Sequence, residues 1–187
     1  MKEVGVVDTH AVQSGQWWRL FTAVTLHENL PHLLSNATVG FLLLGLAMAR
    51  YGPGVALLAA YLAGVAGNWA SVVIYPEPHF SLGASGMVTG ALGLLTVQSF
   101  ALRRKLPLAA KVLPRAVAAG VLVLVLIGFS PGSDMLAHVG GFIAGAILGL
   151  GLAWARPVTL QRHALNITAG LILATLVLGT WSFACRR

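Results

Sequence analysis

Long apolar stretches separated by short turns make up most of this chain. Each has close to the roughly 20 mostly apolar residues that a helix needs to cross a bilayer. They lie at residues 30–49, 54–75, 84–102, 112–129, 135–155 and 165–184. Because lipid offers the backbone no hydrogen-bond partner, segments of this length satisfy their polar groups as helices. The sequence therefore predicts an all-α polytopic membrane protein, a bundle of about six transmembrane helices.

Composition and charge agree with this class. Hydrophobic residues make up 57% of the chain and charged residues 9%, against roughly 25% charged residues in a soluble domain. The net charge of +7 is concentrated between the third and fourth stretches, at Arg103, Arg104, Lys105, Lys111 and Arg115. The positive-inside rule places that loop in the cytoplasm. We therefore expect a multi-pass protein of the plasma (inner) membrane, surrounded by the lipid bilayer, and no nucleic-acid partner.

Turn-forming residues mark the ends of the stretches. Asn29 and Pro31 suit the start of the first helix, and Pro53 follows a break at Gly52. The first 17 residues have no apolar core of the length that a signal peptide needs, so we expect a polar N-terminal extension. We interpret residues 1–187 as a single domain, with an extramembrane segment and loop (1–29), core helices (30–155) and a C-terminal helix (165–184).

Four of the polar side chains inside the apolar stretches are candidates for function. They are His32, Asn36, Ser85 and His138. Such groups are costly in lipid, so their presence there favours a functional site. All five acidic residues lie outside the stretches or at their ends, which disfavours a proton-coupled transporter and an aspartic protease. His27 and His32 are five residues apart with a proline between them, unlike the i, i+4 zinc motif, so we predict no metal site.

Helical spacing relates these residues to one another. His32 and Asn36 are four residues apart and lie on one face of a helix. After His138, Gly141 and Gly145 form a stripe of small residues, and Gly86 and Gly90 follow Ser85 in the same way. We predict that these four glycines are helix-packing positions. Because stripes of small residues let helices approach closely, we expect the two helices to pack together and to bring Ser85 close to His138.

The polar residues also occur in a recognisable order. That order is Trp18-Arg19, His27, His32 and Asn36, Gly83-Ala84-Ser85-Gly86, and Ala137-His138 with Gly141 and Gly145. In this order and spacing, the segment from about 17 to 150 resembles the rhomboid family of intramembrane serine proteases. The resemblance implies a rhomboid-like bundle, a serine endopeptidase activity that needs no metal or cofactor, and transmembrane proteins as substrates cleaved near the membrane boundary.

The resemblance also implies roles for single residues. Ser85 is the expected nucleophile and His138 the expected general base, which together form a dyad. His32 and Asn36 are expected to bind the oxyanion, with Gly83 in the same oxyanion and substrate-binding group. Charge counting sends the loops before Ser85 and His138 to the outer face, so the expected site opens toward the extracytoplasmic side.

Some features depart from the family pattern and leave a second function open. The usual first rhomboid helix is expected to be absent, and the 165–184 helix lies beyond the resemblance. Thr89 stands where many relatives carry an aromatic residue that packs on the histidine. For Asp134, one turn before His138, we favour a helix N-cap over a role as a third catalytic residue. The alternative function is a proteolytically inactive rhomboid-like protein that binds transmembrane clients.

Overall fold

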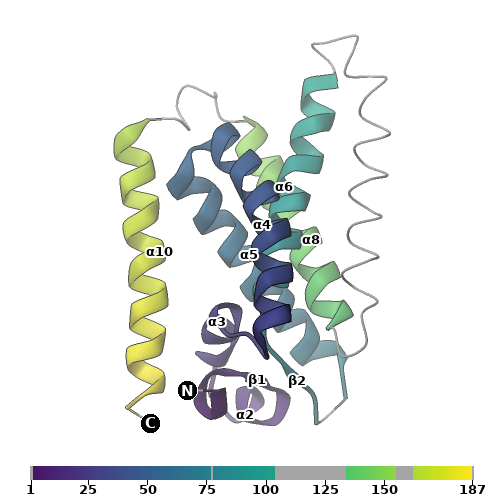
Figure 1. Cartoon of the computed structure of the whole chain (residues 1–187), viewed down its shortest axis with the longest axis vertical. Coiled ribbons are helices and arrows are strands. Elements are labelled where there is room, and N and C mark those ends of the chain that lie inside the picture. The colour runs from purple at the N-terminus through teal and green to yellow at the C-terminus, as the bar shows by residue number, and fades with distance from the viewer. Residues whose placement is uncertain (1, 77, 104–133, 155–161, 187) are drawn as a thin grey trace.

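Long helices dominate the computed structural model, which describes residues 2–76, 78–103, 134–154 and 162–186. The long helices of these residues are α4 (Leu30–Tyr51), α5 (Pro53–Ile74), α6 (Ser85–Arg103), α8 (Met135–Trp154) and α10 (His163–Ala184) (Figure 1). By length and composition, α4, α5, α8 and α10 can each cross a membrane. The predicted all-α polytopic membrane fold is confirmed, and the stretch predicted at 112–129 lies outside the described residues.

The boundary between α4 and α5 follows the predicted turn chemistry. The Asn29 side chain accepts a hydrogen bond of 2.9 Å from the His32 N–H and so caps α4. Gly52 has φ of +87°, a conformation that glycine adopts without the clash that a Cβ brings. Pro53 then occupies the first position of α5, where no intrahelical N–H is needed. The two helices can therefore follow each other directly.

The centre of the bundle is a close contact among α5, α6 and α8. Glycines line this contact. A Cβ on Gly86 would lie 3.4 Å from the Ala137 carbonyl oxygen. A Cβ on Gly141 would collide with the Gly86 carbonyl, and one on Gly145 would collide with the Gly90 carbonyl. The two glycine stripes thus face each other, and the backbones of α6 and α8 approach as small residues allow.

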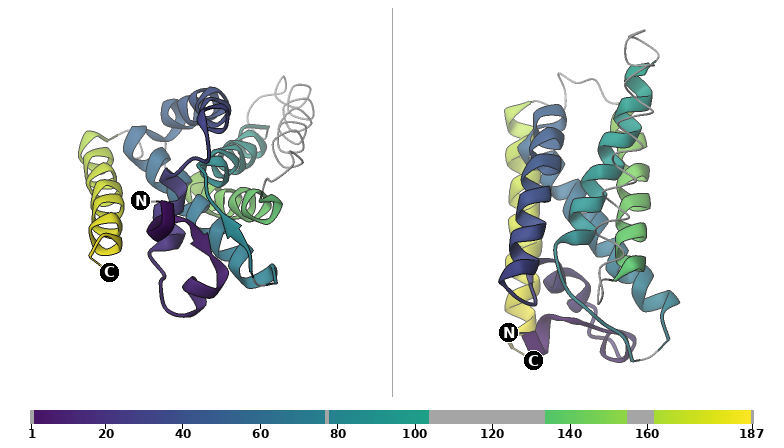
Figure 2. Two further views of the ribbon diagram at one scale, coloured as in Figure 1. Left: turned by 60° about the horizontal axis from the view of Figure 1, so that its bottom comes forward. Right: turned by 45° about the vertical axis from the view of Figure 1, so that its right-hand side comes forward.

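Helix α10 packs against α5 on one side of the bundle (Figure 2). Asn166 of α10 accepts a hydrogen bond of 3.2 Å from the Val55 N–H, which is one of the four N–H groups that the first turn of a helix leaves unpaired. At the other end of α10, the Trp181 indole N–H donates to the Thr25 hydroxyl at 2.9 Å. This helix is therefore attached at both ends.

The N-terminal segment differs from the polar extension that the sequence predicts. It folds into short elements that pack beneath the helices, namely α1 (Lys2–Gly5), β1 (Val7–Asp8), α2 (Thr9–Gln13), α3 (Arg19–Thr22) and the 3-10 helix η1 (Ala23–Thr25). Val7 and Thr9 are fully buried. Strand β1 pairs antiparallel with β2 (Phe80–Ser81), with Val7 opposite Ser81. The segment therefore supports the loop that leads into α6.

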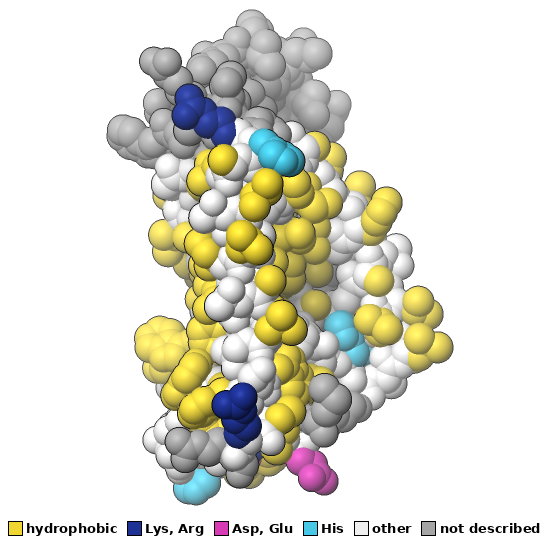
Figure 3. Space-filling model, turned by 90° about the vertical axis from the view of Figure 1, so that its left-hand side faces the viewer, with side chains coloured by type: hydrophobic (Ala, Val, Ile, Leu, Met, Phe, Trp, Pro, Cys, Tyr) yellow, Lys and Arg dark blue, Asp and Glu magenta, His cyan; other side chains and the backbone are white. Residues whose placement is uncertain are grey.

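The surface over the long helices is apolar in the way that a lipid environment favours. Leu171 and Leu178 of α10 and Phe41 of α4 are exposed. Figure 3 shows hydrophobic side chains over the middle of one face, with basic side chains toward its two ends. Both termini lie at the end of the bundle that holds β1 and β2 (Figure 2).

Candidate active site

The start of α6 lies against the start of α4. Gly83 precedes Ser85 in the connecting loop, and a Cβ on Gly83 would lie 2.8 Å from Cε1 and 2.9 Å from Nε2 of His32. The same Cβ would lie 3.7 Å from Nδ2 of Asn36. Gly83 has φ of +135°, so both its conformation and its neighbours exclude a side chain. The structure therefore brings His32 and Asn36 together with the loop that carries Ser85.

Asn36 places an unused hydrogen-bond donor at this point. The residue is 8% exposed, and its Nδ2 atom is buried without a hydrogen-bond partner among the described residues. An unpaired buried donor typically costs about 1–3 kcal/mol. Such a group in a folded protein calls for an explanation, and an acceptor on a bound ligand would supply one.

His27 forms a second wall of this corner. Its ring lies 5.3 Å from the His32 ring in an edge-on arrangement, and its Nε2 atom is buried without a partner in the described part of the chain. Burial lowers the pKa of His27, and the neighbouring His32 lowers it further. The corner therefore favours neutral imidazole at His27.

His138 lies buried in the first turn of α8, beside the first turns of α6. It is 2% exposed, and its backbone carbonyl accepts a hydrogen bond of 3.0 Å from the Thr89 hydroxyl. That hydroxyl also lies 3.1 Å from the Gly86 carbonyl. Thr89 therefore ties the serine helix to the turn of α8 that carries His138.

Ser85 and His138, the predicted nucleophile and base, lie on adjoining helices, and no hydrogen bond joins their side chains in the described part of the chain. Ser85 is partly buried at the first position of α6. Within the part of the chain that the structure describes, no hydrogen bond joins its hydroxyl to the His138 ring, and Nδ1 of His138 is buried without a partner. Catalytic hydrogen bonds are often long in free enzymes and shorten when substrate binds. The absence of this hydrogen bond is therefore compatible with the predicted pairing of Ser85 and His138.

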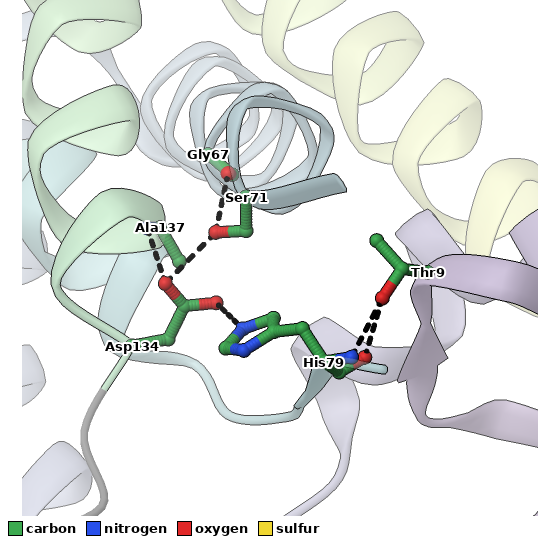
Figure 4. Close-up of polar contacts among 6 residues, drawn as sticks. All are labelled: Thr9, Gly67, Ser71, His79, Asp134 and Ala137. Atoms are coloured by element: carbon green, nitrogen blue, oxygen red, sulfur yellow. Dashed lines mark hydrogen bonds and ion pairs between the residues drawn. The ribbon is translucent and has the colours of Figure 1, made fainter. Parts of the chain in front are cut away.

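The carboxylate one turn before His138 is used elsewhere. Asp134 accepts a hydrogen bond of 2.8 Å from the Ala137 N–H, as an N-cap residue does. It also accepts one of 2.8 Å from the Ser71 hydroxyl and lies 3.1 Å from Nε2 of His79 (Figure 4). Burial by itself raises the pKa of this carboxyl, but the hydrogen bonds it accepts outweigh burial, and the pKa lies below its ordinary value.

Neither His79 nor Ser71 stands out in the sequence as a functional residue. Ser71 lies on α5, and His79 is 55 positions before Asp134. No helical or strand periodicity connects residues that far apart. The one available signal was the position of His79 a few residues before the Gly83-Ala84-Ser85-Gly86 run.

An apolar cavity of about 790 Å³ leads away from this corner along α4. Ala84 and Asn36 line it beside the serine loop, and apolar residues of α4, α5 and α6 line the remainder, among them Leu33, Gly40, Leu44, Met48, Leu57 and Val88. Across the described ranges, no group of three or more histidine, cysteine or acidic side chains is placed to hold a metal ion. The polar chemistry is thus confined to one end of an apolar groove.

Comparisons with known proteins agree with the sequence resemblance. The rhomboid domain family model matches residues 14–155. The chain is 35% identical over 156 residues to Rhomboid protease GluP of Bacillus subtilis (strain 168), a match that covers 79% of this chain and 29% of that protein. It is 28% identical over 157 residues to RHOMBOID-like protein 5 of Arabidopsis thaliana, covering 80% of this chain and 48% of that protein.

A third relative is the Putative rhomboid protease YdcA of Bacillus subtilis (strain 168), 35% identical over 83 residues, with 44% of this chain and 42% of that protein covered. The chain therefore spans less than half the length of these relatives. The family match extends from the segment before α3 to the end of α8, and so includes α4, α5, α6 and α8, the long helices around Ser85 and His138. The chain is a multi-pass membrane protein that belongs to the rhomboid family.

Proposed function

We propose that this protein is an intramembrane serine endopeptidase in which Ser85 is the nucleophile and His138 the general base. The observation that carries the proposal is the buried, unpartnered amide of Asn36 beside the Gly83 loop. A donor held there has no structural use in the described chain, whereas an acyl-transfer reaction needs donors at the carbonyl oxygen that the nucleophile attacks. Family membership supports the same assignment.

The reaction proceeds in two halves. The Ser85 oxygen bonds to the substrate carbonyl carbon while its proton passes to the His138 ring. The tetrahedral adduct collapses as the C–N bond breaks, and the departing amine takes the proton from His138. Water then gives a proton to His138 as its oxygen attacks the Ser85 ester. Collapse of this second adduct releases the carboxylic acid, returns the proton to Ser85 and leaves both residues as they began.

Asn36 and His32 stabilise the negative oxygen of both adducts. Their side chains flank Gly83, and the N–H groups of the first turn of α6 have no partner within the helix. One donor of this kind is typically worth about 3 kcal/mol in the transition state. Removing Asn36 should therefore lower the rate much more than it lowers substrate affinity.

The apolar cavity favours a substrate that arrives from the bilayer. It runs beside α4 and ends at Ala84, next to Ser85. A transmembrane segment whose end unwinds there would keep its apolar side chains in the groove while presenting a free carbonyl, which an intact helix hides. With the basic 103–115 loop on the cytoplasmic side of the plasma membrane, the site opens toward the extracytoplasmic side.

Fluorophosphonate labelling of the purified protein tests the proposal. An activated serine attacks phosphorus and releases fluoride, so wild type should be labelled, whereas Ser85→Ala and His138→Ala should not. Circular dichroism establishes that each variant is folded. Folded wild type that takes up no label would refute the endopeptidase. It would favour a rhomboid-like protein that binds transmembrane clients without cleaving them. The absence of a Ser85–His138 hydrogen bond among the described residues is the observation that favours this alternative.

A further inference from the structure

We propose that His79 and Asp134 form a positioning pair that fixes the loop carrying Ser85 against the helix carrying His138. The pair lies outside the dyad and the oxyanion group, and it joins the segment before α6 to the first residue before α8 (Figure 4). The inference rests on the proposed function, because its consequence is the relative position of nucleophile and base.

His79 is itself held on two sides. Its ring stacks on the Tyr75 ring with centroids 4.1 Å apart. Its backbone N–H donates to the Thr9 hydroxyl at 2.8 Å, and that hydroxyl lies 2.9 Å from the His79 carbonyl oxygen. Strand β1, which ends just before Thr9, also pairs with β2 just after His79. The imidazole is therefore a fixed point on the serine loop, six residues before Ser85.

Asp134 is equally fixed on the side of His138. One carboxylate oxygen accepts hydrogen bonds from the Ser71 hydroxyl and the Ala137 N–H, and the other faces Nε2 of His79. The Asp134 carbonyl accepts the His138 N–H at 3.2 Å. The side chain is 8% exposed, against 22% for that of His79. A charge-assisted contact sheltered to this extent is stronger than one in open water.

These contacts show why the pair acts through position. Both carboxylate oxygens of Asp134 are occupied, and Nδ1 of His138 has no partner among the described residues. Asp134 therefore does not orient the His138 ring as the third member of a triad does. It fixes the start of α8 relative to α5 and to the serine loop. A displacement of about 1 Å between reacting groups can cost on the order of 10²-fold in rate, so even partial loosening should be measurable.

The variants separate the pair from the helix cap. Asp134→Asn keeps an oxygen for the Ala137 N–H, because asparagine caps helices as well as aspartate does, but it removes the negative charge facing His79. His79→Phe keeps a ring to stack on Tyr75 and removes the donor. His79→Gln replaces the ring by an amide that can still donate to Asp134. Asp8→Asn is the matched control, since Asp8 caps α2 in the same way.

The experiment measures the inactivation of detergent-solubilised protein by a fluorophosphonate, resolved into the maximal rate constant and the half-saturating concentration. We expect Asp134→Asn and His79→Phe to lower the maximal rate about tenfold, which corresponds to roughly 1.4 kcal/mol, with little change in half-saturation. His79→Gln and Asp8→Asn should stay within about twofold of wild type. Rates are normalised to folded protein. If Asp134→Asn does not fold, His79→Phe alone tests the positioning pair, because it leaves the cap of α8 intact.

The outcomes distinguish the two proposals. If wild type labels at Ser85 and both pair variants label at its rate, the positioning pair is wrong and the endopeptidase stands. Equal slowing of His79→Gln and His79→Phe would also overturn the pair, because the retained donor would then have no effect. If wild type takes up no label at Ser85, the proposed function fails and the inference fails with it.

Discussion

The packing of α6 on α8 makes Gly145→Ala the most informative single substitution. The added methyl group would collide with the Gly90 carbonyl oxygen and would lie 2.7 Å from the Gly90 Cα. Backbone atoms cannot rotate away as a side chain can, so the two helices must separate. Gly151→Ala is the matched control, because it lies on the same helix and nothing stands within 4 Å of its added methyl group.

The control isolates the cost of the collision. Both substitutions replace glycine by alanine in one helix and share the gain in helix propensity, about 1 kcal/mol. Overfilling a packed contact costs about 1–3 kcal/mol. Separation by even 0.5–1 Å forfeits roughly a quarter to a half of the attraction between the atoms involved. The difference in unfolding free energy between the two variants should therefore be about 1–3 kcal/mol, with Gly145→Ala the less stable.

Thermal unfolding in detergent, followed by far-ultraviolet circular dichroism, measures this difference. For a chain of this size, 1 kcal/mol corresponds to about 2–4 °C in Tm. Fluorophosphonate labelling of the same samples below Tm should also be slower for Gly145→Ala, because separating the helices moves Ser85 away from His138. If the two variants unfold at one temperature and label at one rate, the close contact of α6 and α8 does not set the geometry of the site.

The remaining predictions concern single polar groups. Asn36→Ala should lower kcat for a transmembrane reporter substrate by about 10²–10³-fold with a much smaller change in KM, as loss of one oxyanion donor does; an unchanged kcat would remove Asn36 from the reaction. Asn68→Ala should cost about 1–3 kcal/mol in thermal unfolding, because the buried Asn68 amide donates to the Leu20 carbonyl at 2.7 Å. The pKa of His27 is lowered in the fold, so wild type should lose stability as pH falls below the ordinary value of 6.5. His27→Gln should flatten that dependence, and equal pH dependence in the two proteins would contradict it.

The helices were predictable because their signals are local. Asn29 caps α4 and Pro53 opens α5 as their positions in the sequence indicate. The glycines after Ser85 and His138 recur at helical spacing, and helices with such stripes pack closely. The N-cap reading of Asp134 followed from its place just before an apolar stretch and is confirmed by its hydrogen bond from Ala137.

The N-terminal segment was not predictable in the same way. Its elements are two to five residues long, which leaves too few positions for a periodic pattern. Its stability comes from distant partners, such as the Tyr61 hydroxyl that donates to the Phe21 carbonyl and the Thr22 hydroxyl that donates to the Gly5 carbonyl. Polar residues that look like an extension in the sequence are therefore buried by contacts that no local sequence pattern reveals.

The buried polar atoms left without partners give one further reason to place the chemistry at the start of α4 and α6. Among the described residues these atoms are Nε2 of His27, Nδ2 of Asn36, Oε1 of Gln98 and Nδ1 of His138. Each such group lowers stability by about 1–3 kcal/mol. Local rules of this kind are broken most often where function requires it. Three of the four atoms belong to residues of the candidate site, and a substrate carbonyl placed beside Asn36 would satisfy a donor that the fold itself leaves unpaired.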